Sequence, residues 1–104
     1  MYGLDGEVIW IDDIRPAPIG MRWCKNYDSA IATLDYFVTC EGGIDGVHFD
    51  HDLGQDSKSG YEVAKYIVEN QIPIGYFSVH SMNPVGRSSI IKLLTYYGYK
   101  HKTF

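Results

Sequence analysis

Residues 44–54 read IDGVHFDHDLG, and this stretch decides the fold. The run from Ile44 to Asp50 is short and mainly apolar and ends in polar residues, which is typical of a buried strand. Similar runs occur at 7–11 and 74–79, and a segment with a helical pattern lies between each run and the next. Strands that alternate with helices form a parallel sheet covered on both faces, so we predict an α/β fold with residues 44–50 as its central strand.

The remaining elements are predicted from periodicity and from capping residues. The expected helices are one that follows Asp28 and stops near Gly42, residues 60–70 capped by Ser57 or Ser59, and residues 85–97 with Gly98 as their stop. Two short runs, 21–25 and 99–104, are expected to add an edge strand and a final strand.

The connection after the first strand contains Arg15-Pro16-Ala17-Pro18. Two prolines this close together exclude a regular helix interior. A parallel crossover usually takes a dozen residues or more, and only residues 13–20 separate the first strand from the candidate edge strand. We therefore expect a Pro-rich loop in place of the first crossover helix. The loop either holds Arg15 against an anion at the sheet edge or is only a tight connector.

Composition predicts one domain over residues 1–104, because 45% hydrophobic residues suffice for a single core. The chain has 13 acidic and 9 basic residues, and its net charge of −4 argues against an extended nucleic-acid surface. The N-terminus lacks the pattern of a signal peptide, and no apolar run reaches the roughly 18 residues of a membrane span. We expect a cytoplasmic protein with no membrane contact and with Cys24 and Cys40 as reduced thiols.

Polar side chains follow each of the three buried strands. Residues 12–13 are Asp-Asp, residues 50–52 are Asp-His-Asp, and residues 80–81 are His-Ser. Ligands of parallel α/β sheets bind beyond the carboxyl ends of the strands. Three polar strand ends at one edge therefore predict a shared site.

Asp12, Asp13 and Asp50 are the candidate metal ligands. Three close carboxylates repel one another unless a cation or raised pKa values relieve the repulsion. Oxygen ligands of this kind suit Mg²⁺ or another divalent cation. In the alternative, Asp13 caps a turn and the other two carboxylates are solvated.

Asp50, His51, Asp52 and His80 are the candidate catalytic residues. Imidazole titrates near neutral pH, so two histidines at neighbouring strand ends can serve as a general acid and a general base. Hydrolysis of a cyclic phosphodiester needs both roles, and the sequence leaves open which histidine takes which. In the alternative, His51 or His80 only pairs with Asp50 or Asp52.

Residues 83–87, Asn-Pro-Val-Gly-Arg, open the last predicted helix. The first turn of a helix attracts anions, and arginine can bind a phosphate through two hydrogen bonds. In the alternative, Asn83 is an ordinary cap and Arg87 a surface charge. The candidate phosphate ligands are Arg15, Ser81, Asn83 and Arg87.

The order of these motifs resembles the receiver domain of response regulators, which is a flavodoxin-like three-layer sandwich. By this resemblance, Asp12 and Asp13 match the acidic pair and Asp50 matches the phosphoacceptor. Two departures conflict with a plain phosphorylation switch. The segment 15–18 stands where the first helix would be, and no lysine stands in a clear Lys-Pro pair on a fifth strand.

A closer resemblance is to the cyclic-phosphate processing receiver domains. The stretches that carry it are residues 10–18, 50–54, 60–63 and 79–87. The resemblance implies action on cyclic phosphates such as the 2′,3′-cyclic ends of RNA. A small stand-alone form would suit a bacterial or phage protein.

We therefore hypothesise a metal-assisted phosphoesterase that acts on cyclic phosphates of RNA ends or nucleotides. One alternative is a signalling module phosphorylated on Asp50. Another is a non-catalytic module that binds a phosphate ligand or a protein. The expected partner is a phosphate-containing small molecule or an RNA end, and the nine tyrosines leave room for a homodimer contact.

Overall fold

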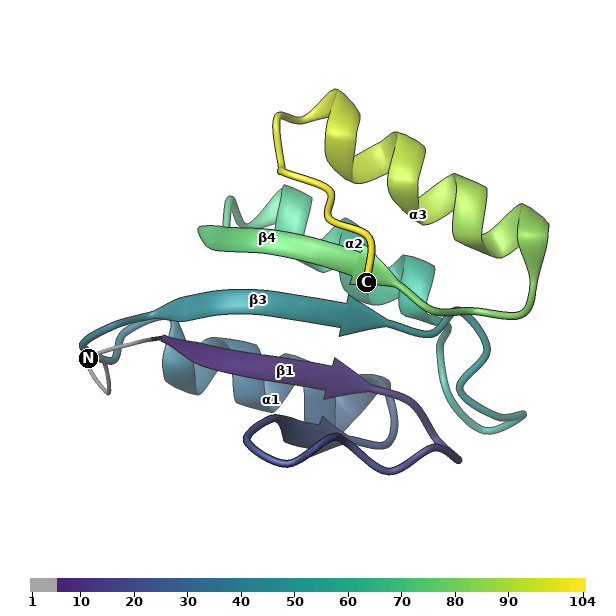
Figure 1. The fold of residues 1–104 in the computed structure, drawn as a ribbon, viewed down its shortest axis with the longest axis horizontal. Coiled ribbons are helices and arrows are strands. Elements are labelled where there is room, and N and C mark those ends of the chain that lie inside the picture. Colours follow the sequence, from purple (N-terminus) through teal and green to yellow (C-terminus); the bar gives the residue numbers. More distant parts are fainter. Residues whose placement is uncertain (1–5) are drawn as a thin grey trace.

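The structure is a computed structural model that describes residues 6–104. Its elements are β1 (Glu7–Ile11), β2 (Arg22–Cys24), α1 (Tyr27–Phe37), β3 (Ile44–Phe49), α2 (Gly60–Glu69), β4 (Ile74–Val79) and α3 (Pro84–Tyr96). The strands form one parallel sheet in the order β2-β1-β3-β4 (Figure 1). The predicted α/β class and the central strand that ends before Asp50 are confirmed.

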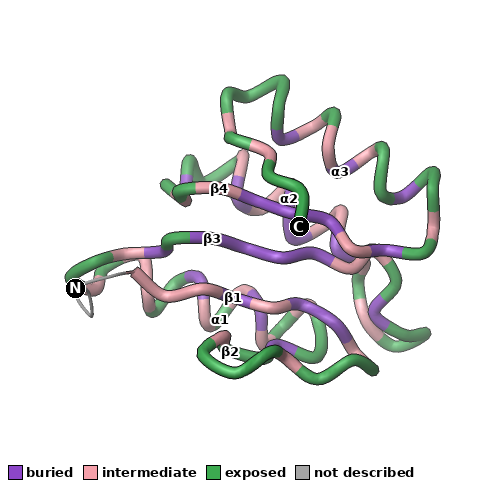
Figure 2. The backbone as a smooth tube through the Cα atoms, in the orientation of Figure 1, coloured by how far each residue is buried: buried purple, intermediate pink, exposed green. Residues whose placement is uncertain are grey.

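Side-chain alternation along the strands divides the sheet into two faces. Ile9 and Ile11 of β1 are buried, and Trp10 between them lies on the other face. The register aligns Ile9 with Val47 and Val47 with Phe77, so buried residues of neighbouring strands form rows. Figure 2 shows that β3 is buried along most of its length and β4 in its second half. These rows and the inner sides of the helices form the hydrophobic core.

All three helices lie on one face of the sheet (Figure 1). The α1 helix packs beside α2, and α3 packs beside α2 as well. The crossovers through α1 and α2 run in the same direction across the sheet, and right-handed crossovers then place their helices on the same face. The connection from β1 to β2 runs in the opposite direction, and residues 12–21 contain no helix.

The predicted three-layer sandwich is therefore incomplete. Among residues 6–104, no helix covers the second face of the sheet, which we call the open face. The physical reason is the direction of the crossovers. The connection from β1 to β2 is the one that runs opposite to the helical crossovers and would cover the open face, and it contains no helix. None of the helices that the structure describes is both long and apolar enough to cross a membrane.

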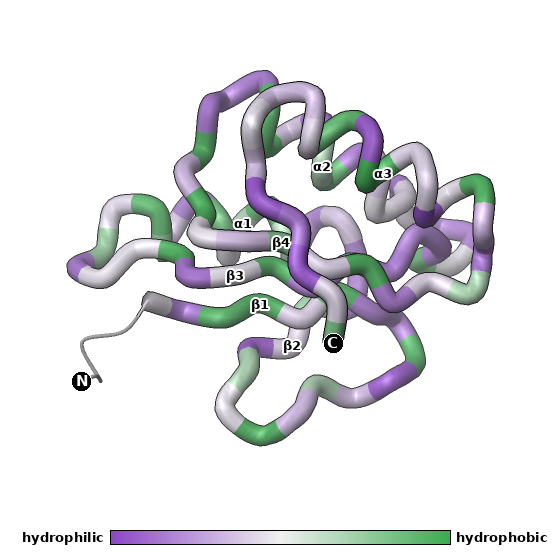
Figure 3. Tube along the Cα trace, turned by 45° about the horizontal axis from the view of Figure 1, so that its top comes forward, coloured by the Kyte–Doolittle hydropathy of each residue, from purple (hydrophilic) through white to green (hydrophobic). Residues whose placement is uncertain are grey.

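The predicted final strand at 99–104 is reduced to a single parallel bridge between Phe77 and His101. The Phe77 amide donates to the Lys100 carbonyl at 2.8 Å, and the Lys102 amide donates to the Phe77 carbonyl at 2.8 Å. This segment is hydrophilic until its last residue and crosses in front of β4 (Figures 1 and 3). Beyond this bridge, the Phe104 ring lies over the open face, with its centre 5.1 Å from that of the His48 ring.

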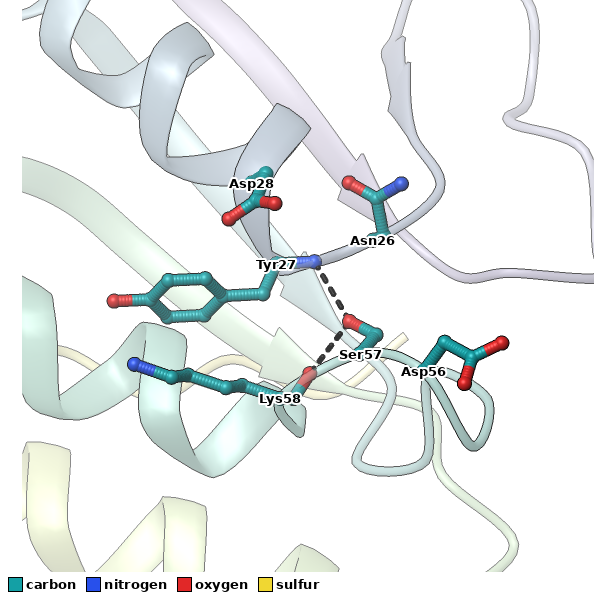
Figure 4. Close-up of a pocket in the computed structure, with 6 residues that line it drawn as sticks. All are labelled: Asn26, Tyr27, Asp28, Asp56, Ser57 and Lys58. Carbon is teal, nitrogen blue, oxygen red and sulfur yellow. Dashed lines mark hydrogen bonds between the residues drawn. The ribbon is translucent and has the colours of Figure 1, made fainter.

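The cap of α1 differs from the prediction, since Asn26 and not Asp28 precedes the helix. The Asn26 Oδ1 atom accepts from the Ser29 amide at 2.8 Å. Asp28 lies in the first turn, where its negative charge interacts favourably with the positive end of the helix dipole. Ser57 accepts a hydrogen bond from the Tyr27 amide at 3.0 Å, which ties the loop after β3 to α1 (Figure 4).

The cap position of α2 is occupied by Ser59, one of the two predicted residues, without a side-chain hydrogen bond. The predicted edge strand at 21–25 is present as the shorter β2, and its last residue, Cys24, is buried beneath α1.

Candidate functional site

Three polar residues meet at the carboxyl ends of β1, β3 and β4. Asp12, Asp50 and His80 each offer one ligand atom, and these atoms all lie within 4.8 Å of one another. The three side chains continue the alternation that places Trp10 and His48 on the open face. The cluster therefore lies at the edge of the sheet, on its open side.

Asp12 is the most deeply buried member of the cluster, with 1% of its surface exposed. Its Oδ1 atom accepts from the amides of Ile14 and Arg15, both at 2.8 Å, and its Oδ2 atom lies 2.9 Å from Nε2 of His80. Burial alone disfavours the charged form of Asp12 and would raise its pKa. The two amides and the histidine outweigh it and hold the pKa of Asp12 below its ordinary value.

His80 connects this carboxylate to an aromatic ring. Its imidazole stacks on the Trp10 indole with ring centres 4.0 Å apart and planes 5° from parallel. Burial lowers the pKa of His80, although the hydrogen bond to Asp12 and the charges of Asp12 and Asp50 oppose this. The neutral ring that donates from Nε2 keeps a lone pair on Nδ1, a buried atom without a hydrogen-bond partner.

Asp50 has the opposite electrostatic environment from Asp12. Burial and the nearby Asp12 charge raise the pKa of Asp50, and a hydrogen bond from the Ser81 side chain opposes this shift. The backbone of Asp50 also lies directly against α2, since a Cβ atom built on Gly60 would lie 2.0 Å from the Asp50 carbonyl oxygen. Only glycine fits at this position, so the start of α2 fixes the end of β3.

A hollow of about 380 Å³ opens beside the cluster. Its lining includes four of the predicted site residues besides Asp12, namely Asp13, Arg15, Asp50 and Asp52. The Arg15 side chain is half exposed, and its Nε atom lies 4.0 Å from Asp12 Oδ2. Asp13 lies in this lining but outside the three-residue cluster.

His51 lies away from the hollow. Its Nδ1 atom is 2.9 Å from Asp52 Oδ1, and its ring packs on α3, where a Cβ atom at Gly86 would lie 2.3 Å from His51 Cγ. The reason is again alternation, because residue 51 follows Asp50 and turns toward the helix-covered side.

The other predicted phosphate ligands lie at the turn between β4 and α3. The Asn83 Oδ1 atom caps α3 by accepting from the Gly86 amide at 3.0 Å. The Ser81 hydroxyl accepts from the Asn83 amide at 3.1 Å, and the Arg87 Nε atom donates to the Val79 carbonyl at 3.4 Å. None of these three side chains lines the hollow that Arg15 enters.

Two tryptophans that the sequence reasoning did not assign to the site hold its backbone. The Trp10 indole donates to the Arg15 carbonyl at 2.9 Å, and the Trp23 indole donates to the Asp12 carbonyl at 2.7 Å. These bonds fix residues 12–15 where no helix supports them. The sequence carried a signal, since Trp10 alternates with the buried Ile9 and Ile11 and must face away from the core.

Comparison with known families agrees with this geometry. The family model described as the cyclic-phosphate processing receiver domain matches residues 8–96. The match includes all four strands, the three helices and the cluster at the strand ends. No curated protein and no solved structure matches the chain. Because the family match covers most of its length, the chain belongs to the cyclic-phosphate processing receiver domain family.

Proposed function

We propose that this domain is a phosphoesterase that hydrolyses cyclic phosphates, either on RNA ends or on nucleotides. The observation that carries the proposal is the convergence of Asp12, Asp50 and His80 within 4.8 Å. Asp12 and Asp50 line the hollow together with Arg15, and His80 contacts Asp12 from beside it. Carboxylates, a neutral imidazole and a guanidinium are the groups that hydrolysis of a phosphate ester requires.

The residues at this site fit a divalent cation. The charge of Asp12 raises the pKa of Asp50, which is the signature of two carboxylates that repel each other. We assign the binding of Mg²⁺ to Asp12 and Asp50, with Asp13 on the same hollow, because Mg²⁺ prefers oxygen ligands. When bound, the cation supplies positive charge to a phosphate oxygen.

His80 is the proposed general acid–base. Hydrolysis forms a bond from phosphorus to a water oxygen, breaks one ester bond of the ring, and moves a proton from the water to the leaving oxygen. The neutral His80 ring is held by Asp12 and stacked on Trp10, so it can exchange this proton at a fixed position. We assign the second proton-transfer role to Asp52, which lines the hollow and is held by His51.

Arg15 is the proposed phosphate ligand. It is the arginine that lines the hollow, and its carbonyl is held by Trp10. Asn83 uses its side-chain oxygen within the turn before α3, and the Ser81 hydroxyl accepts from the Asn83 amide and donates to Asp50. We therefore assign these two residues to shaping the turn and holding Asp50. Arg87 is exposed and contacts only a carbonyl at this end of β4, and we assign it to the outer part of the bound phosphate.

A second candidate function is phosphorylation of Asp50. One observation favours it, since Asp50 ends the central strand beside the buried carboxylate of Asp12, as the receiver resemblance implies. The position of His80 favours hydrolysis instead, because phosphoryl transfer to Asp50 needs no acid–base group. A non-catalytic module, a homodimer and a cytoplasmic location stay predictions.

The two functions can be separated with one substitution. His80→Ala should lower the turnover of adenosine 2′,3′-cyclic phosphate by about 10²–10⁴-fold, since a general acid–base contributes that much. The same variant should keep acetyl-phosphate labelling of Asp50 if a switch is the function. His101→Ala is the matched control, because His101 contacts Phe77 and lies outside the cluster of Asp12, Asp50 and His80. Labelling in both proteins with no turnover by the wild type on any cyclic substrate would replace the enzyme with the signalling module.

A further inference from the structure

The open face carries a row of aromatic rings that the proposed chemistry does not use. The row crosses every strand of the sheet and ends in the C-terminal segment; its members are Trp23, Trp10, His48, Tyr76 and Phe104. We call these five residues the aromatic platform. Ring centres are 5.8 Å apart for Trp10 and His48, and 5.1 Å apart for His48 and Phe104.

The platform is continuous with the hollow. The Trp10 ring stacks on His80 at 4.0 Å, and His80 contacts Asp12 at 2.9 Å. A ligand whose phosphate lies at Asp12 and Arg15 therefore has an aromatic surface directly beside it. The hollow and the platform form one surface, because the charged Asp12 and the aromatic Trp10 are only two residues apart in the chain.

The platform is exposed at its two ends, whereas His48 at its centre is buried. The Tyr76 ring lies on the backbone of β3, because Gly46 offers no side chain, and a Cβ atom there would lie 2.2 Å from the ring. Phe104 is 84% exposed and Trp23 is 36% exposed. Neighbouring rings are tilted by 34° to 83°, so a base would stack on one exposed ring such as Phe104 and not on the whole row. Single-stranded nucleotides stack their bases on individual aromatic side chains in this way.

Charge around the platform favours a nucleotide over an apolar protein surface. Lys25 lies 4.4 Å from the centre of the Trp23 ring, and Lys102 lies 4.8 Å from that of Tyr76. The strand positions that alternate onto this face in β1, β3 and β4 carry no acidic side chain. The chain as a whole has a net charge of −4, and the acidic residues Asp12 and Asp50 lie beyond the ends of the strands, beside the hollow.

We propose that the aromatic platform binds the nucleobase of a nucleotide whose phosphate occupies the hollow. The inference rests on the proposed function and adds to it the surface that would hold the base of the substrate. Phe104, as the most exposed ring, takes the face of the base, and Trp10 lies between the base and the hollow.

The test compares two probes that share a phosphate and a ribose and differ in the base. Adenosine 5′-monophosphate and ribose 5-phosphate are titrated against the full chain by calorimetry. The chain has only two tryptophans, both in the platform, so quenching of their fluorescence reports base stacking directly. The wild type should bind the nucleotide more tightly and show quenching with it alone.

Phe104→Ala should weaken nucleotide binding by about 5- to 100-fold, as loss of one stacking ring does, and leave ribose 5-phosphate binding unchanged. Phe104→Tyr should restore most of the affinity. Tyr96→Ala is the matched control, because Tyr96 is an exposed aromatic residue on α3, far from the platform in the fold. These variants are expected to fold, since both side chains are more than four-fifths exposed.

Equal affinity of the wild type for the two probes would overturn the platform. If cyclic phosphates were still hydrolysed, the proposed function would stand without it. Nucleotide binding that depends on Phe104 without turnover of any cyclic phosphate would instead reject the enzyme and keep the platform. A dimer that Phe104→Ala dissociates, with nucleotide binding unchanged, would show that a second copy covers this face and would also overturn the inference.

Discussion

The two faces of the sheet are built from the same four strands with different chemistry. Ile9, Val47 and Phe77 on the covered face are fully buried beneath the helices. On the open face, Trp10 contacts His48 and stacks on His80 of the site, and no described helix covers these rings. The comparison shows that one set of strands separates stability from function by alternation alone, with the aliphatic core on one side and the groups that hold the site on the other.

The largest difference between the faces should appear in stability. Phe77→Ala removes a fully buried ring from the covered face and should lower the free energy of unfolding by about 3–5 kcal/mol. The neighbouring Tyr76→Ala removes a half-buried ring from the open face and should cost about 1–2 kcal/mol. Urea denaturation of both variants gives the two values. Equal costs would mean that the open face contributes to the core as much as the covered face does.

The open face should instead control activity. Trp10→Leu removes the stack on His80 and the hydrogen bond to the Arg15 carbonyl, and turnover of a cyclic phosphate should fall about 10–100-fold. For a cyclic phosphate that carries no base, the effect should lie in kcat more than in KM and should shift the pH profile, because Trp10 then only positions His80. Trp10→Phe keeps a ring and is the matched control. A loss of activity that follows stability alone in both variants would contradict this role.

A smaller effect is expected where the two strands of the open face touch. Gly46→Ala places a methyl group against the Tyr76 ring, which must move to make room. Replacing glycine in a strand is in itself stabilising, so the net loss of unfolding free energy should be only about 1 kcal/mol. A double-mutant cycle with Tyr76→Ala checks the cause. The cost of Gly46→Ala should vanish when the ring is absent, and an unchanged cost would place the strain elsewhere.

The smallest effect concerns pH. Burial and then the charge of His80 lower the pKa of His48, so the unfolded chain binds a proton at this residue more readily than the folded chain. Stability should therefore fall as the pH drops below the ordinary histidine pKa of about 6.5, by at most about 1.4 kcal/mol per pH unit. The lowered pKa of His80 acts in the same direction. His48→Gln should flatten the profile of unfolding free energy between neutral and mildly acidic pH, and an unchanged slope would assign it to His80.

Much of the fold was predictable because its strands are short apolar runs bounded by polar residues. The number of sheet faces covered by helices was not predictable, because periodicity identifies the helices and strands but not the direction in which each connection crosses the sheet. The order of β2 and β1 in the sheet decides that direction, and the 12–21 connection has no local signal for it beyond its two prolines. The α1 cap was wrong because Asn26 and Asp28 are both good caps two residues apart.

The site was predictable as a location more than as a set of contacts. The sequence places Asp12, Asp50 and His80 at strand ends, and the structure brings these three together. His51 was treated as equivalent to His80, although alternation beyond the end of β3 turns it toward α3. The partners of the backbone around Asp12 depend on the indoles of Trp10 and Trp23, and such tertiary contacts leave no local pattern in the sequence.

Because Cys24 is buried beneath α1, the rate at which its thiol is alkylated reports how often the covered face opens. Burial also raises the pKa of this thiol, so little thiolate is available for alkylation in the native state. Cys40 lies near the surface after α1 and can react without any opening. Mass spectrometry separates chains alkylated at one cysteine from chains alkylated at both. The rate of the second alkylation would therefore measure opening of the covered face, and a ligand bound to the open face would not block it.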